Sequence, residues 1–299
     1  MHKRWQWLRS QVRDSLELFI VPGLAVVLPW PLCFWVFKQL AKSSKLYRYA
    51  TESGWHQAKL CLPELLEEQW KCERRLLTLV DHADLFLSCT RPDTWIKRRM
   101  DVTGNWPSVL EANVVFTFHW GAGMFSLHAM RHAGLQVHAL AASLDSSQFK
   151  GRPVLHQYAK WRTFRVKQLL GHPTVDVKAS MRPVLKAIQK QHSLLAVVDV
   201  PSDHREVSVT VRLLSQHIKV PRGLLRLAAD RKLPVSVFLL GLNHQTGQRE
   251  LKIQSLGVMG DTQQLADNVF EHLDHAVIQA PSAWHLWAEM PRFLNHNKN

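Results

Sequence analysis

The sequence predicts an α/β protein with a mixed, largely parallel sheet flanked by helices. Short apolar runs alternate with amphipathic stretches of helical length over most of the chain, which is typical of β-α-β units. The clearest strand, residues 114–118, is the kind of apolar run expected for a strand buried on both faces. Apolar residues make up 46% and charged residues 21% of the 299 residues, which suits a large core and excludes a disordered chain.

The expected elements follow one another along the chain. A helical pattern begins at Pro63 and resumes over residues 94–100. After strand 114–118, a Gly-rich turn leads into a helix over 124–132 that Gly134 ends, and Pro221 opens a later helix. Further helices are expected over 153–166, 177–191, 221–232 and 262–278, and further strands over 135–143, 193–200, 207–214, 233–242 and 250–257.

An uncharged stretch of 20 residues, 18–37, sets the N-terminal region apart. About 20 apolar residues can cross a bilayer as a helix, and the tryptophans near this stretch prefer the membrane interface. Pro22, Pro29 and Pro31 argue against a straight helix. We therefore expect a membrane anchor over residues 1–40, as a kinked span or an interfacial hairpin, and a globular domain over 41–299. A buried core helix is the alternative.

The chain is basic, with 38 Lys and Arg against 24 Asp and Glu, a net charge of +14. This balance indicates an anionic partner such as acidic lipid or an acidic protein, and the lack of a nucleic-acid-binding motif argues against DNA or RNA. The four cysteines lack zinc-site spacing and are too few for a disulfide framework, so we expect no structural metal. No nucleotide or dinucleotide fingerprint predicts a cofactor.

His119 is the main candidate for chemistry. It follows the predicted central strand directly before the Gly-rich turn, and ligands of α/β sheets bind at the carboxyl ends of strands. A histidine there can act as a general base, while free N–H groups of the turn hold a developing oxyanion. A histidine that only makes loop hydrogen bonds is the alternative.

Six segments in a fixed order carry a family resemblance. They are LPWPLCFWVFKQLAK, AKLCLPELLEEQ, VVFTFHWGAG, RPVLHQYAKWR, LLAVVDVPSD and PSAWHLWAEMPRF. Over nearly its whole length the chain resembles the lipid A late acyltransferases, the lauroyl/myristoyl transferase branch of the lysophospholipid acyltransferase-like superfamily.

The resemblance implies a glycerol-3-phosphate acyltransferase-like fold and a membrane-associated O-acyltransferase on the cytoplasmic side of a bacterial inner membrane. The acyl donor would be the thioester of acyl carrier protein, whose acidic surface suits a basic chain. The acceptor would be a hydroxyl of a lipid, such as a lipid A precursor. His119 corresponds to the histidine of a His-x4-Asp/Glu motif, which removes the proton of that hydroxyl.

Other positions carry over as smaller expectations. Gly121 and Gly123 belong to the turn at the substrate, and Arg162 or Arg165 matches a helix arginine that could hold an acceptor phosphate. The C-terminal motif is expected to be structural; its matching residues are Trp284, Trp287 and Arg292.

One departure from the family concerns the acid of the motif. Met124 stands where the family has Asp or Glu, and no acidic residue occurs between Glu111 and Asp145. A distant acid can replace it, and Asp145 and Asp199 are the candidates because both follow predicted strands. Alternatively, His119 works unaided or oriented by a backbone carbonyl, or the site is inactive.

Three functions therefore remain open. The first is acyl transfer to a lipid A-type acceptor. The second is acyl or aminoacyl transfer to another acceptor, such as a polyene pigment or another envelope lipid. The third is an inactive homologue that binds acyl carrier protein or lipid.

Overall fold

The computed structural model describes residues 2–141, 146–176, 180–202 and 207–294. Within these ranges a sheet of seven strands has the order β1-β9-β8-β2-β5-β3-β4. Its strands are β1 (Met100–Thr103), β2 (Asn113–Thr117), β3 (Val137–Ala141), β4 (Val175–Asp176), β5 (Ser193–Val197), β8 (Pro234–Leu242) and β9 (Arg249–Val258). A separate antiparallel hairpin consists of β6 (Ser208–Leu213) and β7 (Gln216–Pro221).

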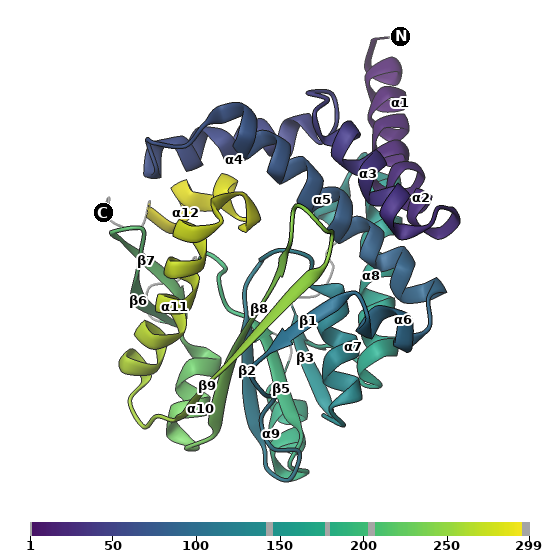
Figure 1. Cartoon of the computed structure of the whole chain (residues 1–299). Coiled ribbons are helices and arrows are strands. Elements are labelled where there is room, and N and C mark those ends of the chain that lie inside the picture. The colour runs from purple at the N-terminus through teal and green to yellow at the C-terminus, as the bar shows by residue number, and fades with distance from the viewer. Residues whose placement is uncertain (1, 142–145, 177–179, 203–206, 295–299) are drawn as a thin grey trace.

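Helices surround the sheet (Figure 1). The first half of the chain contributes α1 (His2–Ser15), a π-helical segment (Leu16–Ile20), α2 (Val21–Val27), α3 (Trp30–Ala41), α4 (Arg48–Cys61), α5 (Glu67–Thr90), α6 (Asp93–Lys97) and α7 (Met124–His132). The second half contributes α8 (Pro153–Leu170), α9 (Arg182–Gln189), α10 (Gly223–Asp230), α11 (Thr262–Gln279) and α12 (Met290–Leu294). Helices α7 and α8 lie on one side of the sheet, and α10 and α11 lie on the other (Figure 1).

The sheet is mixed and mostly parallel, as the sequence predicts. Strand β2 pairs in parallel with both β5 and β8, and β3 pairs in parallel with β5 and β4. Strand β9 runs antiparallel to β8, and β1 is parallel to β9. The carboxyl ends of the central strands therefore meet at one edge of the sheet, where an α/β protein binds its ligands.

Most predicted elements are confirmed, and the errors are local. The helix expected from Pro63 begins at Glu67. The helix expected over 94–100 ends at Lys97, and Met100 begins β1. Pro221 does not open a helix: it is the last residue of β7, and α10 begins at Gly223. The edge pairing of β7 tolerates a proline because Pro221 stands at a strand end, where no ladder hydrogen bond is lost.

The N-terminal region is helical and contributes to the common core. The chain bends at Leu28 and Pro29 between α2 and α3, which agrees with the effect of proline on a helix. Among the described helices, none combines the length and the apolar character that crossing a membrane requires. Side chains of both helices are buried in the core with those of α5, among them Ala25, Phe34 and Phe37. The membrane anchor over residues 1–40 remains a prediction.

Helix α5 carries polar side chains on its buried face, each with a partner elsewhere in the chain. Its charged or hydroxyl-bearing members are Lys71, Arg74, Arg75, Asp81, Asp84 and Ser88. The pair formed by Asp84 and Arg249 is fully buried: Arg249 binds both carboxylate oxygens, and its Nη1 donates to the carbonyl of Gly247 at 2.7 Å. The guanidinium also lies 4.1 Å from the ring centroid of Trp30 and 4.7 Å from that of Phe125. This one cation thereby connects α3, α5, α7 and β9.

We expect Arg249→Met to lower the free energy of unfolding by about 3–5 kcal/mol, because it leaves the Asp84 carboxylate buried without its counterion. Urea unfolding followed by circular dichroism measures the loss. The matched control is Arg226→Met, since Arg226 pairs with Asp230 while both are more than half exposed, and such a pair contributes at most about 1 kcal/mol. Equal losses in the two variants would contradict the role given to the buried pair.

Candidate active site

The parallel register of β2 and β5 brings His119 and Asp199 together. Thr117 is the register partner of Val197, and the N–H of Val198 still donates to the carbonyl of Thr117 at 3.1 Å. Two residues beyond the last paired positions, His119 and Asp199 therefore stand side by side. His119 and Asp199, both predicted to follow a strand, thus lie at the same edge of the sheet.

Asp199 is fully buried, and both oxygens of its carboxylate accept hydrogen bonds. The backbone N–H of His119 donates to Oδ1 at 2.9 Å and lies 3.0 Å from Oδ2. The His119 ring donates from Nδ1 to Oδ1 at 3.0 Å, and the indole Nε1 of Trp284 donates to Oδ2 at 2.8 Å. These bonds compensate for the cost of burying a carboxylate and fix its orientation relative to the imidazole.

The bond to Asp199 determines which nitrogen of His119 is available for chemistry. Because a carboxylate only accepts, Nδ1 carries the proton, and Nε2 presents its lone pair. No hydrogen-bond partner of Nε2 is found among the described residues, and the side chain is 40% exposed. Burial lowers the pKa of His119, but the hydrogen bond and charge of Asp199 outweigh it and raise the pKa above 6.5. The charge of Arg162 opposes this rise.

A second histidine, His285, joins the C-terminal segment to the turn after His119. Arg74 donates from Nη2 to His285 Nδ1 at 2.9 Å, so the proton of this ring is on Nε2, which donates to the carbonyl of Gly121 at 2.7 Å. Burial, followed by the charge of Arg74, lowers the pKa of His285 to about 3. The backbone N–H of His285 also donates to the backbone carbonyl of His119 at 2.8 Å. His285 is therefore a neutral bridge that positions the strand end carrying His119.

The Gly-rich turn has a structural function at Gly121. Its φ is +60°, and a Cβ would lie 1.8 Å from the carbonyl oxygen of Leu240, so only glycine fits. At Gly123, a Cβ would meet no atom within 4 Å.

The expectation that the free N–H groups of this turn hold an oxyanion fails for three residues, because they already donate within the protein. The backbone N–H of Trp120 donates to the carbonyl of Phe118. The N–H of Gly121 donates to Ala283, and that of Ala122 donates to Leu240.

The two candidate arginines have different surroundings. Arg162 donates to Asp81 at 2.8 Å and to the Tyr158 hydroxyl at 3.4 Å, with its side chain 31% exposed. Burial alone would lower its pKa, but Asp81 outweighs burial and raises it, so Arg162 is always charged. Arg165 instead binds the hydroxyl and the carbonyl of Ser88 near the end of α5. Of these two arginines, only Arg162 affects the pKa of His119.

Two other positions concern the acid of the motif. Met124, at the family's acid position, is 2% exposed and packs in the core. Asp145 lies outside the described residues. Asp199 is thus the acid that the described structure places against the His119 ring.

Sequence reasoning missed two residues of the site and gave another too small a role. Arg74 lies within an apolar helical pattern, and His285 is one of 17 histidines, so only their long-range contacts, 164 and 211 residues apart in sequence, distinguish them. Trp284 was expected to be structural, but its indole binds the carboxylate beside His119. No family model and no curated protein sequence matches the chain.

We expect the Asp199→Asn variant to lower the pKa of His119, because it removes the negative charge that favours the imidazolium. The ring signals of His119 in an NMR titration measure the shift. Since the pKa is raised in the folded protein, the pair contributes its full stability below pH 6.5 and loses it as the pH rises through the folded value. An unchanged pKa of His119 in Asp199→Asn would contradict the assignment of the bond.

Proposed function

We propose that the protein is a membrane-associated O-acyltransferase in which His119 is the general base and Asp199 orients it. The observation that carries this proposal is the His119–Asp199 bond, which leaves Nε2 unprotonated and without a partner among the described residues. The order of the six family-like segments supports acyl carrier protein as donor and a lipid A-type lipid as acceptor. It also supports the finer assignment of the sheet to the glycerol-3-phosphate acyltransferase-like fold.

The reaction needs one proton carrier and no covalent acyl-enzyme. Nε2 of His119 removes the proton of the acceptor hydroxyl, whose oxygen attacks the thioester carbonyl of the donor. Asp199 stabilises the imidazolium that forms. The tetrahedral intermediate then collapses, the C–S bond breaks, and the proton on Nε2 passes to the leaving thiolate.

Arg162 is the residue that we assign to an anionic group of the acceptor or donor. Its guanidinium is charged, partly exposed and close enough to His119 to affect the pKa of that ring. The bonds to Asp81 and Tyr158 occupy two of its donor groups and hold the guanidinium in place. A fixed arginine of this kind suits a phosphate better than a mobile lysine does.

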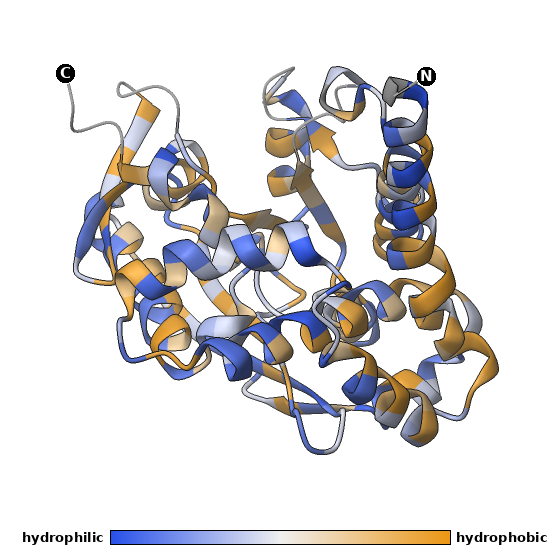
Figure 2. Cartoon of the chain, turned by 90° about the horizontal axis from the view of Figure 1, so that it is seen from above, coloured by the Kyte–Doolittle hydropathy of each residue, from blue (hydrophilic) through white to orange (hydrophobic). Residues whose placement is uncertain are grey.

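The N-terminal helices provide the surface that we assign to the membrane. Four exposed apolar residues lie on one helical face, at positions 5, 8, 12 and 16. They line a groove of about 400 Å³ together with Leu40 and Leu46, and Arg9, Arg13 and Lys45 stand among them; His119 does not line this groove. Figure 2 shows hydrophilic and hydrophobic bands on the helix beside the N label, as expected for a helix lying in a lipid interface.

We expect His119→Ala to lower acyl transfer by about 10²–10⁴-fold, the usual contribution of a general base. Asp199→Asn should lower it by between about 10- and 10⁴-fold, because the ring loses its orienting partner. Turnover is measured in membranes with loaded acyl carrier protein and a lipid acceptor. The rate of the wild type should rise as the pH passes the raised pKa of His119, since the base must be neutral, and Asp199→Asn should move this limb to lower pH.

The control for this experiment is His217→Ala, which removes an exposed histidine of β7 and should leave turnover unchanged. Equal turnover of the wild type and His119→Ala would refute His119 as the base. Absence of turnover in the wild type with every donor and acceptor supplied would favour a protein that binds acyl carrier protein or lipid without reacting.

We expect the double variant Trp5→Gln, Leu8→Gln to bind anionic vesicles at least tenfold more weakly than the wild type, because each apolar side chain buried in lipid contributes about 1.5–3 kcal/mol. Co-sedimentation with vesicles of phosphatidylglycerol measures binding. The matched control is Leu110→Gln, which changes an exposed apolar residue before β2. Equal weakening by the control would show that general hydrophobicity, not this helix face, determines binding.

A further inference from the structure

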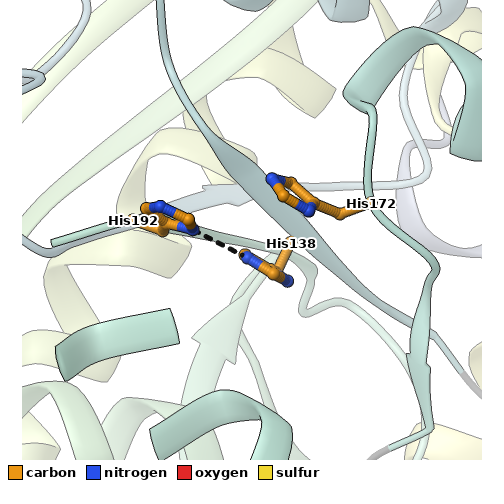
Figure 3. Close-up of side chains that lie close together, drawn as sticks. All are labelled: His138, His172 and His192. Carbon is orange, nitrogen blue, oxygen red and sulfur yellow. Dashed lines mark hydrogen bonds between the residues drawn. The ribbon is translucent and has the colours of Figure 1, made fainter. Parts of the chain in front are cut away.

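Three histidines meet at the end of the sheet opposite to His119. His138 is the second residue of β3, and His192 directly precedes the first residue of β5, whereas His119 follows the last residue of β2. Because these strands are parallel, the two sites lie at opposite edges. His172 completes the cluster from the loop after α8, and Figure 3 shows the three rings facing one another.

The ring nitrogens of the cluster converge. One nitrogen from each of His138, His172 and His192 lies within 4.8 Å of the other two. His138 Nε2 and His192 Nδ1 are 3.0 Å apart and share a hydrogen bond (Figure 3). The rings of His138 and His172 stack with centroids 4.1 Å apart and planes inclined by 15°.

Local backbone features hold each histidine in this place. Gly171, with φ of +73°, ends α8 and directs the chain into His172. Gln191 adopts a left-handed conformation, with φ of +61°, immediately before His192. The N–H of Ser193 donates to the carbonyl of Gln136 at 2.8 Å, which aligns the starts of β3 and β5.

The electrostatics of the cluster favour neutral rings. Burial, and then the neighbouring histidines, lower the pKa of His138 to about 4, and burial also lowers the pKa of His192. A neutral imidazole has one nitrogen lone pair free to bind a cation. Without a cation, the half-buried cluster contains only one hydrogen bond between its three rings.

We propose that His138, His172 and His192 bind a divalent transition-metal ion of the zinc type. Three imidazole nitrogens suit Zn²⁺, Ni²⁺, Co²⁺ or Cu²⁺ and do not suit Mg²⁺ or Ca²⁺, which prefer oxygen ligands. With Zn–N bonds of about 2.0 Å, tetrahedral ligand atoms lie about 3.3 Å apart. Binding therefore requires the rings to turn out of their stacked arrangement until their lone pairs point at one ion. The described cluster offers three ligands, so water or a bound molecule completes the coordination.

The surroundings of the cluster support this assignment. Gln136 Oε1 accepts a hydrogen bond from His172 Nε2 at 3.3 Å. Metal-binding imidazoles commonly have an outer hydrogen-bond partner of this kind. A pocket of about 210 Å³ is lined by Gln136 and Gly171, close in sequence to the cluster, although the three histidines do not line it. The cysteine spacing predicts no structural metal. His138, His172 and His192 are 20 or more residues apart, so no local spacing indicates them.

Metal titration of the full chain tests the proposal without an activity assay. The protein is purified without a polyhistidine tag, and Zn²⁺ is titrated in competition with a chelating dye. Co²⁺ is then added, and its visible absorption reports tetrahedral coordination. We expect one tight Zn²⁺ site per chain and an intense Co²⁺ band. Each of His138→Ala, His172→Ala and His192→Ala should weaken the site by about 100-fold or more, because each removes a ligand.

The control His217→Ala removes an exposed histidine outside the cluster and should leave the affinity unchanged. Zn²⁺ should also raise the unfolding temperature of the wild type and of the control, but not that of the three variants. His172→Ala carries the test if the strand variants fold poorly, since His172 lies in a loop. Wild-type binding no tighter than that of the variants, or a tight site retained in all three, would overturn the proposal. The titration does not depend on acyl transfer, so its result stands even if the protein proves inactive as an acyltransferase.

Discussion

The buried carboxylate of Asp199 is the constraint on which the candidate site depends. A charge with no exposure must be matched by donors, and here they come from two distant segments: the end of β2 and the indole of Trp284. The same bonds that satisfy the carboxylate also fix the imidazole of His119. The C-terminal segment is therefore part of the candidate site, although His119 and Asp199 both stand at strand ends.

Helix α5 provides the second level of support. Arg74 donates to the carbonyls of Ser282 and Trp284 and to the ring of His285, so it holds the segment that in turn holds Asp199. About two turns and about four turns further along, Asp81 and Ser88 bind the two arginines of α8. Polar residues on a buried helix face cost free energy unless each has a partner. Arg74, Asp81 and Ser88 find theirs in the C-terminal segment and in α8.

The sequence predicts what depends on local patterns. Apolar runs ending at Phe118 and Val198 identify β2 and β5, and parallel pairing of neighbouring strands then makes Asp199 a reasonable partner for His119. The contacts of Arg74 and His285 depend on packing between segments more than 200 residues apart, which periodicity does not encode. Strands β1 and β7 were missed for a related reason: each is short and partly polar, and its pairing partner, not its own sequence, makes it a strand.

The two histidine sites show how surroundings decide the chemistry of one side chain. Next to a fixed carboxylate, burial is outweighed, and His119 becomes a stronger base with a defined tautomer. At the opposite edge of the sheet, burial makes the protonated form of His138 unfavourable, and the neighbouring imidazoles and Lys190 add to this effect. The first arrangement suits transfer of a proton, because gaining one is stabilised by Asp199. The second suits coordination of a metal ion, because several ring nitrogens lie close together where protons are disfavoured. Among the described residues, the hydrogen-bonded carboxylate thus lies beside His119 at one edge of the sheet, and the cluster of three imidazoles lies at the other.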